Sequence, residues 1–332
     1  MGPKRKLFLI AAGALFLIVL AIVAFLLLGK NLNKPQTSFP QNKNSAQTES
    51  KWQERGVVVA GQYADAEVVD LGNGQFRMYY SIEPEVPGNN LEVYSAVSKD
   101  GINWTKEAGT RKRLATFPDV VKLPSGQWRM YFQNGGVIKS ALSTDGLKWA
   151  DEAGTRIDKG QPGFDLDNVG AQSTIRLDDS TYIMVYRGTI NESYATKEKL
   201  PNQDMHIYFW ATSKDGLTFE KKGLAIDSRN ETLLGAADGA EWVRWDTSTS
   251  SEPELRVYFW SYAGVYRVTY NQRTFSKAVF DFTNNKDSLA KFPQNPPADP
   301  TLAKINSKWF MYYGQHTKGI YYATWTAGKG GE

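Results

Sequence analysis

The sequence has 332 residues, a formal net charge of +4 at pH 7 and no cysteine. The absence of cysteine excludes disulfides, thiolate zinc sites and cysteine nucleophiles. Residues 1–50 hold six Lys and Arg against one acid, or +5, which leaves −1 for the remaining chain and argues against a basic nucleic-acid-binding surface.

An uncharged apolar stretch comes first in the chain. Residues 7–28 contain no charged side chain, and three basic residues precede them. As a helix these 22 residues would be about 33 Å long, enough to span a bilayer. No small-residue cleavage site is evident, so the pattern favours a transmembrane signal anchor, residues 7–29, over a cleaved signal peptide. We expect a short cytoplasmic end, residues 1–6, and a single-pass protein whose domain faces the extracellular or periplasmic side.

A polar segment follows the apolar stretch. Residues 30–50 are rich in Asn, Gln, Ser, Thr and Pro and contain almost nothing apolar. Because such a composition cannot bury a core, we expect a flexible linker between the anchor and a folded domain.

The rest of the sequence repeats itself. The related segments GQFRMYYS, GQWRMYFQ and SKWFMYYG stand at residues 74–81, 126–133 and 307–314, and weaker copies lie at 171–188 and 238–261. After each copy, Tyr, Val, Ile and Trp alternate with other residues, which indicates a β-strand. The residues that open the five units are 53 to 66 positions apart, near the size of a four-stranded propeller blade with its loops. They are Asp65, Asp119, Gln172, Asp238 and Asp299.

A second pattern, S-x-D-G-x-x-[WF], stands at residues 98–104, 143–149 and 213–219. Asp-Gly supplies a tight turn that tolerates positive φ, and the aromatic residue can pack back between sheets. We interpret these turns as structural, each joining the third strand of a blade to the outermost one.

The fifth unit has one strand too few. Only seven residues follow its alternating segment, so residues 52–61 are expected to supply the outer strand and close the ring without a free edge. The sequence therefore predicts an all-β fold, one five-bladed β-propeller over residues 51–332, preceded by one N-terminal transmembrane helix. Its blades would start near residues 62, 117, 168, 236 and 297. A two-sheet sandwich would not explain five similar units.

The starts of the innermost strands are unusually acidic. In a propeller these starts converge at one mouth of the central channel, and carboxylates gathered there raise one another's pKa. Glycoside hydrolysis needs such a pair, with one carboxyl group protonated and one ionised. The same acids could instead fix loops through hydrogen bonds to backbone amides. The acids are Asp65, Glu67, Asp119, Asp238, Glu241 and Asp299.

Units that open with DP- or DxE-like sequences and continue with G-x-[FW]-x-M-Y-Y resemble the five-bladed furanosidase-type glycoside hydrolases. That group, a glycosyl hydrolase family 43/32-like superfamily, includes arabinanases, β-xylosidases, levansucrases and invertases. The resemblance covers residues 51–326. It implies a general base or nucleophile in the first blade, at Asp65, and a general acid in the fourth blade, at Glu241.

The third blade departs from the resemblance. Where the family has an aspartate that tunes the acid, this sequence has Gln172 and Ser173, so either Asp167 or Asp119 substitutes for it or the acid set is incomplete. The candidate catalytic residues are Asp65, Glu241 and Asp119. The candidate substrate-binding residues are Glu67, Asn168, Gln172, Arg187, Asp238, Trp242, Asp299 and His316.

The sequence thus predicts a membrane-anchored glycoside hydrolase that acts on a poly- or oligosaccharide as a monomer, without nucleic acid and without a required cofactor. A structural calcium ion stays open, because His316 lies in the fifth blade, where relatives place a histidine near a central calcium. A non-catalytic carbohydrate-binding or adhesive propeller is the alternative, since the same channel could hold a sugar without cleaving it. A sialidase-like enzyme is less well supported, because no arginine triad accompanies Arg187.

Overall fold

The computed structural model describes residues 51–192, 204–246, 252–284 and 296–326, all within one compact unit. The expected anchor and linker lie outside the described residues. Among those that are described, no helix has the length and apolar character needed to cross a membrane.

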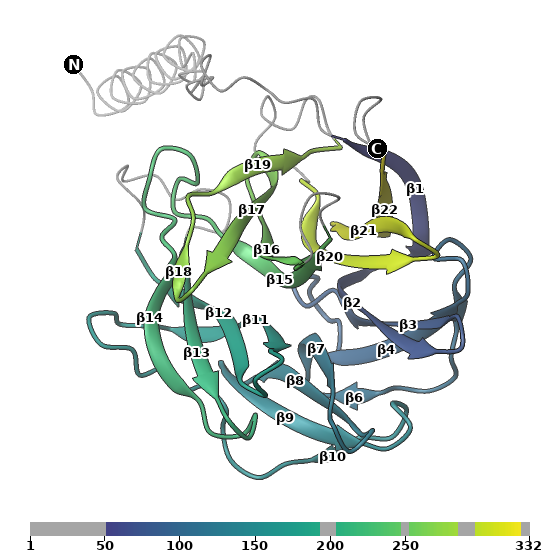
Figure 1. Cartoon of the computed structure of the whole chain (residues 1–332), viewed down its shortest axis with the longest axis horizontal. Helices are drawn as coiled ribbons and strands as arrows, with labels where there is room; N and C mark the ends of the chain where they lie inside the picture. The colour runs from purple at the N-terminus through teal and green to yellow at the C-terminus, as the bar shows by residue number, and fades with distance from the viewer. Residues whose placement is uncertain (1–50, 193–203, 247–251, 285–295, 327–332) are drawn as a thin grey trace, which may run out of the picture. The chain divides into compact units, whose positions relative to one another are not determined.

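The described strands form five antiparallel sheets around a common centre (Figure 1). This confirms the predicted five-bladed β-propeller. The first blade consists of β2 (Tyr63–Gly72), β3 (Gln75–Ile82), β4 (Glu92–Ser98) and β5 (Thr105–Lys106), with β6 (Lys112–Arg113) also paired to β4. The second consists of β7 (Thr116–Lys122), β8 (Trp128–Asn134), β9 (Val137–Ser143) and β10 (Ala150–Asp151). The third consists of β11 (Asn168–Arg176), β12 (Tyr182–Ile190), β13 (Met205–Ser213) and β14 (Glu220–Ile226).

The last two blades close the ring. The fourth consists of β15 (Asp238–Trp245), β16 (Glu254–Ser261), β17 (Gly264–Asn271) and β18 (Thr274–Phe275), with β19 (Val279–Phe282) paired to β17. The fifth consists of β20 (Ala298–Ile305), β21 (Lys308–Gln315), β22 (Gly319–Trp325) and β1 (Trp52–Ala60). The purple β1 lies beside the yellow β22 in Figure 1, paired from Trp52 opposite Trp325 to Ala60 opposite Gly319. The two ends of the described chain therefore share one sheet, which leaves no open seam between the first and last units.

The hydrophobic core is divided into five clusters, each between two neighbouring blades. Met78, Met130 and Met311, the methionines of the repeated Met-Tyr pattern, are completely buried in these clusters. The apolar half of the repeat thus holds the blades together, which is why it recurs in the sequence.

The two sequence repeats meet in space. Tyr79 of the first blade donates a 2.8 Å hydrogen bond to the carbonyl of Gly146, in the S-x-D-G turn of the second blade. Tyr131 makes the same bond to Gly216 of the third blade, also at 2.8 Å. Tyr312 of the fifth blade repeats it to Gly101 of the first. Each turn is therefore a fastening point for the preceding blade, as its structural interpretation requires.

Charged side chains reinforce two of these fastenings. Arg129 binds both carboxylate oxygens of Glu152 at 2.8 and 2.9 Å, and its Nη1 donates to the carbonyl of Asp215 in the next blade's turn. Arg77, Glu107 and Asp145 form the same arrangement between the first and second blades. A bidentate Arg–carboxylate pair fixes the guanidinium direction, so each arginine is held toward its neighbouring blade.

The third blade lacks the fastening tyrosine, and the fourth blade lacks the S-x-D-G turn that this tyrosine would meet. In the third blade Val185 occupies the position of the fastening tyrosine, opposite Ser173 in the register. The neighbouring fourth blade has a turn through Gln272 and Arg273 instead of the S-x-D-G pattern. A tyrosine hydroxyl there would have no equivalent carbonyl to meet, which explains the weaker sequence copy.

We expect Tyr131→Phe to lower the free energy of unfolding by about 1–3 kcal/mol, because the buried carbonyl of Gly216 loses its donor. Urea unfolding measures this cost. Tyr79→Phe provides the matched comparison, since it removes an identical bond to Gly146. If neither change shifts the unfolding midpoint, the fastening does not stabilise the propeller.

Candidate active site

A repeated backbone feature builds the site. The inner strand of every blade has a β-bulge, which is one extra residue relative to the second strand of the same blade. In all five blades the bulge lies at the same level, and the bulged residue has positive φ. Such bulges re-aim side chains, here toward the propeller centre. The bulged residues are Asp65, Phe117, Ala171, Gly239 and Asp299.

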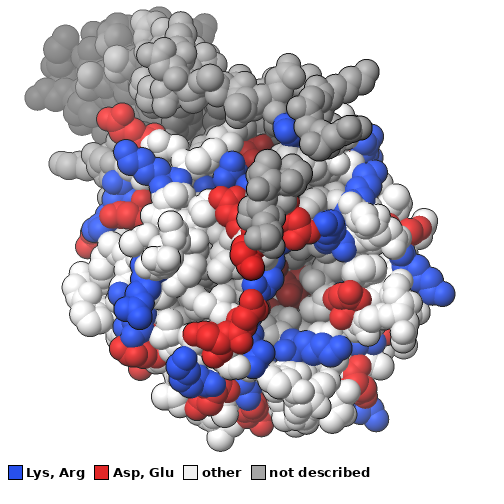
Figure 2. Space-filling model, in the orientation of Figure 1, with Lys and Arg blue, Asp and Glu red and all other residues white. Residues whose placement is uncertain are grey.

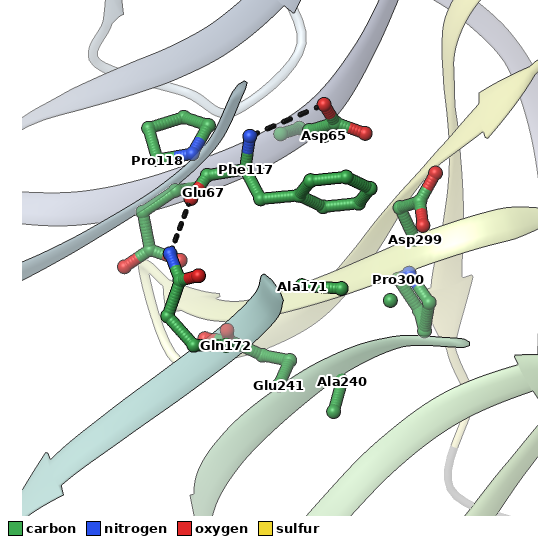
Figure 3. Close-up of a pocket in the computed structure, with 12 residues that line it drawn as sticks. Asp65, Glu67, Phe117, Pro118, Ala171, Gln172, Ala240, Glu241, Asp299 and Pro300 are labelled. Carbon is green, nitrogen blue, oxygen red and sulfur yellow. Dashed lines mark hydrogen bonds between the residues drawn. The ribbon is translucent and has the colours of Figure 1, made fainter. Parts of the chain in front are cut away.

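The bulges surround a pocket of about 310 Å³, counting open solvent at its mouth. Figure 2 shows a hollow near the middle of the viewed face with acidic side chains in and around it. The acidic residues that line the pocket are Asp65, Glu67, Glu241 and Asp299 (Figure 3). No lysine, arginine or histidine is among the described residues that line it.

At the bulge level, two aspartates stand on neighbouring strands. Asp65 Oδ2 accepts a 3.3 Å hydrogen bond from the backbone N–H of Phe117, and Asp299 Oδ1 accepts a 3.0 Å bond from Trp260 Nε1. Burial raises the pKa of Asp65 to about 7. Burial and the charge of Asp65 raise the pKa of Asp299 well above its usual range. Both groups can therefore carry protons near neutral pH.

Two residues further along the inner strands lies a second level of side chains. Glu67 is buried, Asp119 is almost completely buried, and Glu241 is partly open to the pocket. Burial is the main cause that raises the pKa of Asp119 to about 8 and that of Glu241 to about 8. Burial and the charges of Glu241 and Asp119 also raise the pKa of Glu67 strongly. The five side chains at this level are Glu67, Asp119, Ser173, Glu241 and Thr301.

Glu241 has two partners that matter for a proton donor. The hydroxyl of Ser173 donates to Glu241 Oε2 at 3.1 Å, while Ser173 Oγ itself accepts from the backbone N–H of Trp242 at 2.9 Å. The carboxyl groups of Glu67 and Glu241 are hydrogen-bonded to each other. Glu241 is thus fixed in direction from two sides while its carboxyl group faces the pocket.

A buried ion cluster stands beside the pocket. Arg187 Nη1 contacts both carboxylate oxygens of Asp238, at 2.8 and 2.7 Å, and His206 Nδ1 lies 3.0 Å from Asp238 Oδ2. Burial opposes ionisation of Asp238, but the charges and hydrogen bonds of Arg187 and His206 together outweigh it and hold the pKa of Asp238 well below its usual range. Asn168 Oδ1 receives longer contacts from Arg187 and a 3.0 Å bond from Thr189. Asp238 is thus held by two basic side chains, which gives the cluster a supporting position next to the pocket.

The structure separates the candidate residues into groups. Asp65, Glu67, Gln172, Glu241 and Asp299 line the pocket. Asp119 acts on Glu241 through its charge from behind the lining, and Arg187, Asp238 and Asn168 form the neighbouring cluster.

Trp242 is not brought to the pocket. Its ring packs edge-on against Tyr270 in the core between the third and fourth blades, because the strand pleat turns it away from Glu241.

Three of the five unit starts drawn from the sequence are out of register with Asp65. The residues of the second and third blades that are equivalent to Asp65 are Phe117 and Ala171, not Asp119 and Gln172. Asp119 is equivalent to Glu67. The reason is that the polar residues taken as unit starts do not hold one structural position: Asp119 lies two residues after the bulged Phe117, Gln172 one residue after Ala171, and Asp238 one residue before Gly239.

Phe117 is the aromatic pocket residue that the sequence analysis missed. Its ring points toward Asp299 in Figure 3, its backbone carbonyl accepts a 2.6 Å bond from Gln172 Nε2, and Arg187 stands 5.5 Å from the ring centroid. Positive φ is strained for a bulky residue and here places the ring in the pocket. Its position before Pro118, like Asp299 before Pro300, was the available signal.

A group that could hold a metal ion lies on loops at the ends of β3 and β21. Glu83, Glu85 and His316 bring their ligand atoms within 4.8 Å of one another, and His316 Nδ1 contacts Glu83. Calcium prefers six to eight oxygen ligands, whereas this group offers two carboxylates and an imidazole nitrogen. These three side chains would therefore supply only part of a calcium shell, and water or backbone oxygens would have to supply the rest.

No protein-family model matches the sequence, and no curated protein matches it. Solved structures do match. A complex of BT0996 with RGII has a TM-score of 0.60 at 13% identity, over 84% of this protein and 92% of that one. The RS223 β-xylosidase has a TM-score of 0.56 at 14% identity, over 84% and 97%. A GH43 β-xylosidase/α-arabinofuranosidase from a compost microbial metagenome, with xylotriose and in a calcium-free form, has a TM-score of 0.53 at 14% identity, over 84% and 97%.

The protein has the propeller fold of these xylosidases. Identities of 13–14% establish the architecture and leave the chemistry to the residues of the pocket.

The raised pKa values make the propeller's stability depend on pH. Carboxyl groups of the unfolded chain release their protons at pH about 4, whereas the folded state retains a proton on Asp65 up to pH about 7 and on Asp119 and Glu241 up to pH about 8. The free energy of unfolding should therefore fall as pH rises through this window, by about 1.4 kcal/mol per pH unit for each retained proton. Asp238 has a lowered pKa, so its contribution is lost only below this window.

Urea unfolding at several pH values between 5 and 8 measures this slope. Glu241→Gln should make the slope shallower, because one retained proton is removed. A free energy that stays constant or rises across the window would contradict the protonated cluster.

Proposed function

We propose that this protein is a glycoside hydrolase in which Glu241 is the general acid and Asp65 is the base or nucleophile. The observation that carries the proposal is the placement of both carboxyl groups in one pocket with unequal proton affinities. Because the pKa of Asp65 is near 7 and that of Glu241 near 8, the pair is partly in the ionised and protonated forms that hydrolysis needs between these values.

The remaining lining supports a sugar as the ligand. Phe117 stands beside the aspartates of the bulge level and offers aromatic surface for a sugar face. Gln172 Oε1 is buried without a hydrogen-bond partner, so it is available to accept a bond from a hydroxyl group. A pocket rich in acceptors suits a ligand rich in hydroxyl donors.

We propose a poly- or oligosaccharide substrate. The matched structures include complexes with RGII and with xylotriose, which supports this class of ligand. The uncharged stretch at residues 7–28 supports a membrane anchor that places the propeller outside the cytoplasm.

The test uses the full-length protein in detergent against arabinan, xylan, fructan and a set of aryl glycosides. Release of sugar, with a product that grows with time and enzyme concentration, supports hydrolysis. Binding of a glycan without any release across the set would overturn the proposal in favour of a carbohydrate-binding propeller.

A further inference from the structure

Glu67 occupies an unusual environment for a carboxyl group. It lies on β2, at the level of four side chains from the other inner strands. These are Asp119 of β7, Ser173 of β11, Glu241 of β15 and Thr301 of β20. Glu67 is 7% exposed. The titratable groups that act on it most strongly are Glu241 and Asp119, both acids. Arg187, the nearby buried cation, is already bound to both oxygens of Asp238.

The contact between Glu67 and Glu241 requires a proton. An ionised carboxylate is only an acceptor, so a hydrogen bond between two carboxyl groups exists only when one of them carries a hydrogen. Glu67 is 7% exposed while Glu241 is partly open to the pocket, and Glu241 also accepts a hydrogen bond from Ser173, which favours its charged form. The hydrogen therefore resides on Glu67, and Glu241 accepts it.

Glu67 stands too close to Glu241 to be the second carboxylate of a hydrolytic pair. A hydrogen bond between carboxyl groups joins oxygens roughly 2.5–3.0 Å apart. The carboxyl groups of glycosidases are about 5–5.5 Å apart in retaining enzymes and about 6.5–9.5 Å apart in inverting ones. Glu67 must therefore act on Glu241 and not on the sugar carbon.

We propose that Glu67 is an uncharged carboxylic acid that positions Glu241 and donates a hydrogen bond to the carboxylate that Glu241 becomes when it gives up its proton. This inference rests on the proposed function for its catalytic consequence. In that step the proton of Glu241 passes to the glycosidic oxygen as the C–O bond breaks, and the proton of Glu67 stays on Glu67. The hydroxyl of Ser173 donates to the same carboxyl group. Two neutral donors, from the first and third blades, thus stabilise one developing charge.

If Glu67 is uncharged, two of its variants should have different pH profiles. In Glu67→Gln the side-chain amide is also a neutral donor, so the alkaline limb of the kcat/KM profile should stay within about half a pH unit of the wild-type position. In Glu67→Met the donor is lost while the volume is kept. Because a hydrogen bond to a charged group contributes about 1.5–3 kcal/mol, the pKa of Glu241 should rise by about 1–2 units, and the alkaline limb should move up with it.

Infrared spectroscopy of the full-length protein at pH 7 supplies a readout that does not need activity. Glu67→Gln should remove intensity from the carbonyl band of protonated carboxylic acids and leave the carboxylate band unchanged. Ser173→Ala is the matched control, since it removes the other donor to Glu241. It should also move the alkaline limb of the kcat/KM profile to higher pH. It should leave the infrared band of protonated carboxylic acids unchanged.

The outcomes separate this inference from the proposed function. Loss of carboxylate intensity in Glu67→Gln would overturn the uncharged acid, and so would a limb that moves equally in Glu67→Gln and Glu67→Met. If the wild-type protein hydrolyses no glycan, the proposed function fails, while the infrared comparison still decides the protonation state of Glu67.

Discussion

Glu241→Gln should lower kcat on an alkyl or sugar-linked glycoside by about 10²–10⁴-fold, the usual contribution of a general acid. Glutamine preserves the shape of the side chain and its contact with Ser173, but it has no acidic proton to give to the leaving group. Initial rates of sugar release measure the loss. The structural reason to expect the full effect is that Glu241 lines the pocket, has a raised pKa and is fixed in direction by Ser173.

The leaving group provides the internal control. An aryl glycoside with a strongly acidic phenol needs little protonation, so the loss in Glu241→Gln should shrink on that substrate. Asp65→Asn should lose activity on both substrates, because it removes the base or nucleophile instead. Equal losses for Glu241→Gln on good and poor leaving groups would assign the acid to another residue.

The pH profile offers an independent check of the same pair. The rate should rise as pH passes about 7, where Asp65 becomes ionised, and fall as pH passes about 8, where Glu241 loses its proton. The profile should therefore be a narrow bell, since one group must be ionised while the other is protonated. In Glu241→Gln the alkaline fall should disappear from whatever activity remains.

The blade architecture was predictable because the repeated residues fasten one blade to the next. Met78 and Met130 fill the clusters between blades, and the tyrosines after them meet the S-x-D-G turns, so both repeats are visible in a single sequence. Alternating strands need only local patterning to be recognised.

The alignment of the site was less predictable because a bulge carries no residue signature of its own. The bulged positions of the five inner strands hold two aspartates, a phenylalanine, an alanine and a glycine. The repeat itself carries the register, since Met78 lies eleven positions after Glu67 and Met130 lies eleven positions after Asp119.

Long-range pairing within the site has no signal in one sequence. Arg187, His206 and Asp238 come from β12, β13 and β15, and only the packing of the third blade against the fourth brings them together. Glu67 likewise looked like one more strand-start acid until its contact with Glu241 was known.

Arg187→Met should be the most destabilising of the changes considered, at about 3–5 kcal/mol, because it leaves the carboxylate of Asp238 buried without its main partner. The side chains of Arg187 and Asp238 are 10% and 8% exposed, so water cannot replace the lost contacts. Urea unfolding at pH 7 measures the difference. Arg113→Met is the matched control, since Arg113 pairs with Glu92 but is 78% exposed, and its loss should cost no more than about 1 kcal/mol.

The dependence of this cost on pH identifies Asp238 as its source. The lowered pKa of Asp238 means that its pairing stabilises the wild-type protein above the unfolded value of about 4 and that this contribution is lost as pH falls through the folded value. The deficit of Arg187→Met should therefore be largest near neutral pH and shrink below pH about 4. Adding Asp238→Asn to Arg187→Met should recover part of the stability at pH 7, because the buried charge is then gone. A double variant less stable than Arg187→Met would show that the guanidinium supports the fold through its packing against Phe117 and not through its charge.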